Sequence, residues 1–305
     1  MEDNLPWPTE QAIENNSVPP LCQPASNLCL DFHGDPLRAK LVVYSDGNHH
    51  MALQAVTELF AKQHPAVEDI FYATTPPNLL LAGLRHGAID VGNLRLSRQP
   101  DVFISPLTIM KQLRDEGFVE DYQPFMQSRG NVLLIHKTNA KNITCIEDVL
   151  RDDVRLFISN PDREKASYQV YYQTLQGLLQ QAGVDIQKLE TKISAGASAT
   201  VFGERIHHRE APQALYNDEA DVAMVYYHLA LRYTRIFPDL FDFIPLGGSK
   251  ASPHPDPANV TTTFYVTALC DSSEWGERFV NFLQGDEAAQ LYSFHGLSRP
   301  AGNAI

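Results

Sequence analysis

Hydroxyl-bearing side chains stand at the ends of two expected strands, where they could offer hydrogen bonds to a ligand. Ser45 follows the apolar, β-branched run Leu41–Tyr44, and the pair Thr74 and Thr75 comes just after the strand expected at 67–72. Hydroxyls and the free N–H groups of a helix N-terminus are donors that a small anion accepts. The ordinary alternative is that these residues only cap the helices that follow them. Their types and places therefore allow an anion site.

Histidines next to these turns could support a different chemistry. His49 and His50 come directly after the Ser45 turn, and His228 comes directly after the strand expected at 220–226. Neutral imidazoles bind transition metals, and protonated ones attract anions. Surface or helix-capping histidines are the alternative. A further pair, His207–His208, stands in a charged stretch and is expected to be solvated.

Composition narrows the class of protein. The 305 residues, 44% hydrophobic and 20% charged, suffice for two globular lobes, and the net charge of −13 argues against nucleic acid or an anionic membrane as partner. We expect no membrane insertion, because no apolar run reaches the length of a span. The acidic start, Met1–Asn4, lacks a secretory signal, so the compartment stays open between the cytoplasm and the periplasm after signal removal. Cys22 and Cys29 could form a small disulfide loop.

Strands and helices alternate along most of the chain. Residues 51–63 have apolar positions at helical spacing, and further strands are expected at 67–72, 88–91, 101–105, 131–136, 154–158, 220–226 and 264–269. The expected helices after the first are 78–86, 107–116, 146–150, 166–183, a segment through Arg235, 275–283 and 287–295. This alternation predicts an α/β fold with a largely parallel sheet, and such sheets bind ligands at the carboxyl ends of their strands.

The order of several short motifs resembles the substrate-binding proteins of molybdate and tungstate ABC transporters, within the two-lobed type II periplasmic binding protein fold. The motifs are Leu41–Ser45, the pair Thr74–Thr75, Asp101–Ser105, Asn142–Val149, the turn Ser159–Pro161, Glu219–Val222, Val225–Tyr226 and the closing stretch Phe279–Gly296. Each motif is short, and their collinear order carries the resemblance.

Residues 1–38 are rich in Pro, Asn and acidic residues and show no periodicity, so we expect an irregular N-terminal arm, which the family lacks. The resemblance implies a first lobe at 39–127 plus 245–305 and a second lobe at 128–244. It implies a cleft between the lobes that holds a small oxyanion such as molybdate, tungstate or sulfate, with no cofactor and no catalysis. The implied ligand contacts are Ser45, Thr74, Thr75, Ser167, Tyr168 and Tyr226. The implied partner is an ABC permease, and the protein is expected to be a monomer.

The sequence departs from this family at two turns. Asp46, His49 and His50 follow the first strand where the family has small neutral residues, and His228 lies in a segment where it often has Thr-Asp-Ala. A divalent metal held by His49, His50, His228 and a carboxylate is therefore a first alternative. An enzyme on the same scaffold, such as the fungal thiamine pyrimidine synthases, is a second, although their cysteine-rich motif does not appear here.

Overall fold

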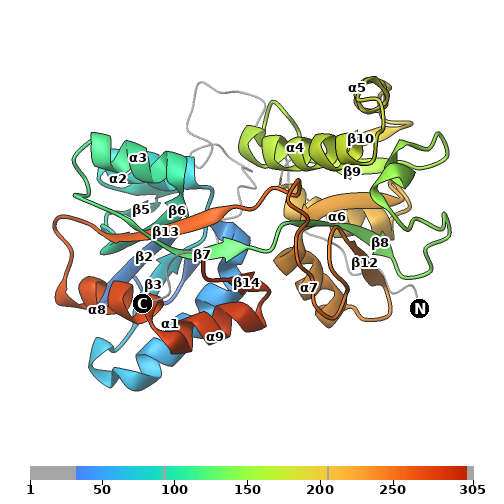
Figure 1. Cartoon of the computed structure of the whole chain (residues 1–305). Helices are drawn as coiled ribbons and strands as arrows, with labels where there is room; N and C mark the ends of the chain where they lie inside the picture. The colour runs from blue at the N-terminus through green and yellow to red at the C-terminus, as the bar shows by residue number, and fades with distance from the viewer. Residues whose placement is uncertain (1–31, 92–93, 205, 301–305) are drawn as a thin grey trace, which may run out of the picture. The chain divides into compact units, whose positions relative to one another are not determined.

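The computed structural model describes residues 32–91, 94–204 and 206–300. They form two compact units, which we name unit 1 (residues 32–125 and 264–291) and unit 2 (residues 126–263 and 292–300). Figure 1 labels many of the helices and strands of both units. The possible disulfide between Cys22 and Cys29 lies outside the described residues. No helix in the described ranges is both long and apolar enough to span a membrane.

The first sheet has the strand order β1-β3-β2-β6-β13-β7-β14. The strands are β1 (Phe32–His33), β2 (Leu41–Ser45), β3 (Ile70–Ala73), β6 (Val102–Pro106), β7 (Gln123–Ser128), β13 (Thr263–Ala268) and β14 (Leu297–Ser298). β2 is parallel to β3 and to β6, which confirms the predicted parallel arrangement for these three strands. β1, β13 and β14 pair antiparallel with their neighbours, so the sheet as a whole is mixed.

Helices cover both faces of the parallel strands of unit 1, as Figure 1 shows. They are α1 (His50–Gln63), α2 (Pro77–His86), α3 (Leu107–Asp115) and α8 (Glu274–Gln284), while β4 (Ile89–Val91) and β5 (Leu94–Leu96) form a separate hairpin. Val42 and Tyr44 belong to a buried cluster with leucines of α2 and α3. On the α1 side, the ring of Phe60 lies 5.0 Å from that of Phe279 in α8. This double coverage explains why β2 is apolar at successive positions.

The second sheet, in unit 2, has the order β10-β9-β11-β8-β12. Its strands are β8 (Asn131–His136), β9 (Leu156–Ile158), β10 (Thr200–Phe202), β11 (Val222–Tyr226) and β12 (Phe241–Pro245). β9 is parallel to β10 and β11, whereas β8 is antiparallel to β11 and β12. The helices are α4 (Lys165–Gln181), α5 (Gln187–Ser194), α6 (His207–Tyr216) and α7 (Tyr227–Ile236), with α4 and α7 on opposite faces of the sheet (Figure 1).

Several elements differ from the sequence prediction. The expected strand 67–72 begins only at Ile70, because the short helix η3 (Pro65–Val67) precedes it. The expected helix 146–150 is a 3-10 helix, η4 (Ile146–Leu150), and the closing helix α9 is Asp286–Phe294. The helices α5 and α6 and the strands β5, β7, β10, β12 and β14 were not predicted, since each is short or has few apolar residues. Within the segment predicted to be irregular, β1 pairs with β3.

Candidate functional site

Four buried hydroxyls lie at the carboxyl ends of the three parallel strands of unit 1. Ser45 ends β2 and is level with Ile104 of β6, so that Ser105 lies one residue beyond. Thr74 and Thr75 directly follow β3, whose last residue pairs with Tyr44. All four side chains are buried. We call Ser45, Thr74, Thr75 and Ser105 the unit 1 edge.

Within the described ranges, three of these hydroxyls lack a hydrogen bond. The Oγ1 atoms of Thr74 and Thr75 and the Oγ atom of Ser105 have no partner among the described residues. Ser45 differs, because its Oγ atom lies 3.1 Å from the carbonyl oxygen of Asp46 and 3.2 Å from Nε2 of His49. Its single hydroxyl proton therefore already has an acceptor inside unit 1. Sequence reasoning had not selected Ser105, although its place at a strand end was the available signal.

The turn after β2 is held closely against the turn after β3. The backbone N–H of Asn48 donates to Oδ1 of Asp46 over 2.7 Å, which makes Asp46 the cap of the short helix η2 (Gly47–His49). Burial raises the pKa of the Asp46 carboxyl to about 6. A Cβ atom on Gly47 would lie 2.7 Å from the carbonyl oxygen of Thr74, so only glycine fits there without a shift. The tight turn thereby fixes the place of the Thr74 backbone.

The histidines of the metal alternative have separate local contacts. The buried ring of His49 lies 4.9 Å from the ring of Phe264 in unit 1, and Nδ1 of His50 is 2.9 Å from the carbonyl oxygen of Gly47. In unit 2, the buried ring of His228 stacks on that of Tyr226 at 5.2 Å. Across residues 32–91, 94–204 and 206–300, no three His, Cys, Asp or Glu side chains gather as metal ligands would.

The predicted contacts of unit 2 lie at its own sheet edge and at the start of α4. Tyr226 ends β11, is buried, and has its hydroxyl 3.0 Å from Oγ1 of Thr262. The Ser167 hydroxyl donates to the carbonyl oxygen of Glu164 over 3.0 Å, a bond within the first turn of α4 and not a helix cap. The ring of Tyr168 stacks on that of Tyr172 at 5.6 Å.

The expectation that His207 is solvated is wrong. It is the first residue of α6 and is 2% exposed, because α6 packs its apolar residues Ala211, Ala214 and Leu215 into the core of unit 2. Burial lowers the pKa of its imidazole to about 3, so the ring is neutral. Its backbone N–H donates to Oε2 of Glu164 over 2.8 Å. Burial raises the pKa of that carboxyl to about 7 despite this bond, and the charge of Glu210 adds to the rise.

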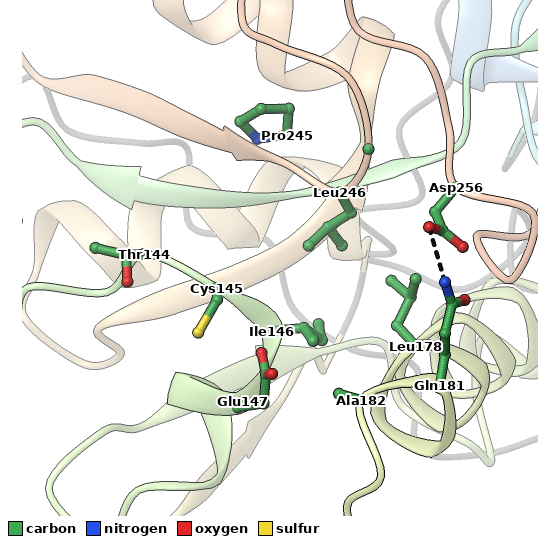
Figure 2. A pocket seen from close by; sticks show the side chains of 11 residues that line it. Thr144, Cys145, Ile146, Glu147, Leu178, Gln181, Ala182, Pro245, Leu246 and Asp256 are labelled. Carbon is green, nitrogen blue, oxygen red and sulfur yellow. Dashed lines mark hydrogen bonds between the residues drawn. The ribbon is translucent and has the colours of Figure 1, made fainter.

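A groove of about 370 Å³ in unit 2 lies apart from these residues. Its lining includes Thr144, Cys145 and Glu147 on one side and Leu178 and Gln181 of α4 on the other, as Figure 2 shows. Gln181 donates to Oδ2 of Asp256 over 3.2 Å at its border. None of the candidate residues lines this groove, so its size does not mark it as the ligand site.

Comparisons with known proteins agree on the kind of fold. The periplasmic molybdate-binding protein of Azotobacter vinelandii is 17% identical, over 86% of this chain and 100% of that one, with a TM-score of 0.61. The sulfate-binding protein SubI of Mycobacterium tuberculosis H37Rv is 18% identical, over 87% of each chain, with a TM-score of 0.59. Iron-bound HitA of Pseudomonas aeruginosa is 14% identical, over 82% of each chain, with a TM-score of 0.57. No curated protein matches the sequence.

At these identities the solved structures establish likeness of fold alone. They confirm the predicted α/β fold of the type II periplasmic binding protein class. The family match is of a different kind, because it recognises the sequence itself: the model of bacterial extracellular solute-binding proteins matches residues 41–298. The chain therefore belongs to the family of bacterial extracellular solute-binding proteins.

Proposed function

We propose that this solute-binding protein takes a small tetrahedral oxyanion, such as molybdate, tungstate or sulfate, at the unit 1 edge. The observation that carries the proposal is the group of three buried hydroxyls, on Thr74, Thr75 and Ser105, without partners in the described residues. A buried polar group without a hydrogen bond costs about 1–3 kcal/mol, and such groups are rare in native proteins. An oxyanion would give all three hydroxyls a strong acceptor.

Neutral hydrogen-bond donors are sufficient to bind an oxyanion. Hydrogen bonds to a charged acceptor contribute about 1.5–3 kcal/mol each, so several hydroxyls can replace the water shell of a dianion without any cationic side chain. This suits a chain whose net charge is −13. The names of two structural neighbours, a molybdate-binding and a sulfate-binding protein, point to the same ligand class.

The remaining parts of the proposal follow from the family. Solute-binding proteins carry small ligands to ABC permeases, and we propose such a permease as the partner, with no cofactor and no catalysis by the chain itself. We also propose a monomer, with lobes at 39–127 plus 245–305 and at 128–244 as the sequence predicts. Ser45, Ser167, Tyr168 and Tyr226 stay proposed ligand contacts beside the three hydroxyls.

A divalent metal bound through His49, His50 and His228 is the competing candidate. It is favoured by one neighbour, HitA, whose structure is described as iron-bound. The two candidates require opposite chemistry, because an oxyanion needs donors whereas a metal needs deprotonated imidazoles and carboxylates.

Isothermal calorimetry separates the two candidates. Wild-type protein is titrated with molybdate, tungstate, sulfate and zinc, beside the variant Thr75→Val and the double variant His49→Ala with His50→Ala. We expect at least one oxyanion to bind, Thr75→Val to weaken it by about 1–3 kcal/mol, and the histidine variant to matter less. Binding of zinc alone, lost in the histidine variant, would overturn the oxyanion proposal.

A further inference from the structure

Unit 2 carries an exposed aromatic side chain among arginines. Phe294, the last residue of α9, is 62% exposed. Arg232 and Arg235 lie on α7, and Arg129 directly follows β7. We call Arg129, Arg232, Arg235 and Phe294 the arginine patch. In a chain whose net charge is −13, the patch is a local concentration of positive charge.

Hydrogen bonds and ring stacking hold the patch together. Nη1 of Arg235 donates to the carbonyl oxygen of Phe294 over 2.8 Å, and the guanidinium carbon lies 4.4 Å from the centre of the Phe294 ring. Nη2 of Arg129 donates to the Oγ atom of Ser293 over 3.4 Å. Residues that are far apart in the sequence are thereby gathered at the end of α9.

The arginines of the patch are close enough to act on the same neighbours. Burial raises the pKa of Tyr227, and the charges of Arg129 and Arg235 oppose that rise. Burial lowers the pKa of His295, and the charges of Arg235 and Arg232 lower it further. The hydrogen bonds of Arg129 and Arg235 end on neutral oxygens, and neither side chain forms an ion pair within the described ranges. A carboxylate is therefore still missing from both.

These features fit a polypeptide that is acidic and partly apolar. Arginine and aromatic side chains are enriched at protein interfaces, and a guanidinium can hold a carboxylate through two parallel hydrogen bonds. Carboxylates would also offset the repulsion between neighbouring arginines. A small inorganic anion would leave the exposed ring of Phe294 uncovered, so the apolar part of the patch favours a peptide.

The first 31 residues of the chain have the required composition. They contain five carboxylate side chains and no Lys, Arg or His, and their apolar residues include Trp7. The carboxylates are those of Glu2, Asp3, Glu10, Glu14 and Asp31. A segment of this length spans up to about 100 Å, whereas a compact chain of 305 residues has a radius of gyration of about 20 Å. Its reach therefore does not depend on how the two units are oriented.

We propose that residues 1–31 bind the arginine patch, with their carboxylates on the guanidinium groups and apolar side chains such as Trp7 on the ring of Phe294. The inference goes beyond the proposed function, because no residue of the patch belongs to the unit 1 edge. Attachment to the same chain raises the effective concentration of the segment to about the mM range, so weak contacts keep the patch occupied. The bound segment excludes other acidic proteins from the patch.

Cleavage by glutamyl endopeptidase, which cuts after Glu, tests the proposal on the full chain. Mass spectrometry follows the fragments that end at Glu10 and Glu14 in wild type, in the double variant Arg129→Gln with Arg235→Gln, and in a synthetic peptide of residues 1–31. Wild type should be cleaved more slowly than the free peptide, because a bound segment is protected. The double variant should be cleaved about 2- to 30-fold faster than wild type, the effect of two exposed ion pairs on the population of the open form.

The double variant Arg85→Gln with Arg278→Gln is the matched control. It removes two arginines of unit 1 that pair with Glu116 and Glu274, so its cleavage rate should equal that of wild type. Phe294→Ala keeps every charge and should also speed cleavage, and melting temperatures show that each variant is folded. Wild-type protein that is cleaved as fast as the free peptide overturns the inference. Patch variants that are cleaved no faster than the control overturn it as well.

Discussion

The two sheet edges share a topology and differ in chemistry. In unit 1 the strands β3, β2 and β6 are parallel and end in aliphatic hydroxyls, three of which have no partner among described residues. In unit 2 the strands β10, β9 and β11 are parallel, and their edge combines Ser159 with Tyr226 and a neutral His207 among aromatic rings. Strand register alone places small hydroxyls, whereas a buried imidazole needs a surrounding core. The polar groups of the unit 1 edge are therefore positioned by its strands and turns, whereas the imidazole of His207 in unit 2 is positioned by side-chain packing.

The largest expected effect is the loss of two hydroxyls from the unit 1 edge. Thr75→Val combined with Ser105→Ala should weaken molybdate binding by about 2–6 kcal/mol, which is the sum of two lost donors. Ligand-free stability should not fall, because neither hydroxyl has a partner in the described residues. Calorimetry measures the affinity, and thermal melting measures the stability.

Thr57→Val is the matched control for this double variant. Thr57 is also buried in unit 1, but its hydroxyl already donates to the carbonyl oxygen of Leu53 over 3.0 Å. Its replacement should leave affinity unchanged. A double variant that binds molybdate as the wild type does would contradict the role of the unit 1 edge.

The second effect concerns the buried carboxyl of unit 1. Burial raises the pKa of Asp46 from 3.8 to about 6, so the folded state binds the carboxyl proton more tightly than the unfolded state does. Protonation of Asp46 therefore stabilises the folded protein at low pH, and this contribution is lost as pH rises through 6. Asp46→Asn keeps an oxygen for the N–H of Asn48 and removes the titration. Relative to wild type, its free energy of unfolding should rise by on the order of 3 kcal/mol between pH 4 and pH 7. Urea unfolding at several pH values measures this, and a difference that is flat with pH would contradict it.

A smaller effect of the same sign is expected in unit 2. The pKa of Glu164 is raised from 4.5 to about 7, chiefly by burial, so stability present at low pH is lost as pH rises through 7. Glu164→Gln retains an acceptor for the N–H of His207. Because Glu164 is only half-buried, we expect a relative gain of on the order of 1 kcal/mol at pH 8 compared with pH 5. If the free energy of unfolding of Glu164→Gln relative to wild type rises only below pH 5, Glu164 is not the titrating group.

The smallest effect separates Ser45 from its neighbours at the unit 1 edge. Its hydroxyl proton already has an acceptor, either the carbonyl oxygen of Asp46 or Nε2 of His49. Ser45→Ala should therefore weaken molybdate by less than about 1 kcal/mol, below the cost of losing a free donor. Calorimetry beside Thr75→Val makes the comparison directly. A larger loss of molybdate affinity for Ser45→Ala than for Thr75→Val would mean that the Ser45 hydroxyl donates its hydrogen bond to the ligand.

Local sequence patterns determined the main secondary-structure elements of this protein. Short apolar runs followed by turn residues located β2, β6, β8 and β11, and with them the edge positions of Ser45 and Tyr226. The sequence also located Thr74 and Thr75 at a strand end, since the residue types mark where a strand ends. Elements that are very short, such as β10, or have few apolar residues, such as α6, gave no comparable signal.

Tertiary structure alone decided which polar groups are satisfied and which are charged. Ser45 and Ser105 are both serines at strand ends, yet only the first meets a nearby imidazole. His207 stands in a polar stretch of sequence and becomes buried and neutral because Phe157 and Tyr171, distant along the chain, enclose it. Hydrogen bonding depends on distances of a few tenths of an ångström, and desolvation sums contacts from the whole fold, so neither can be read from neighbouring residues.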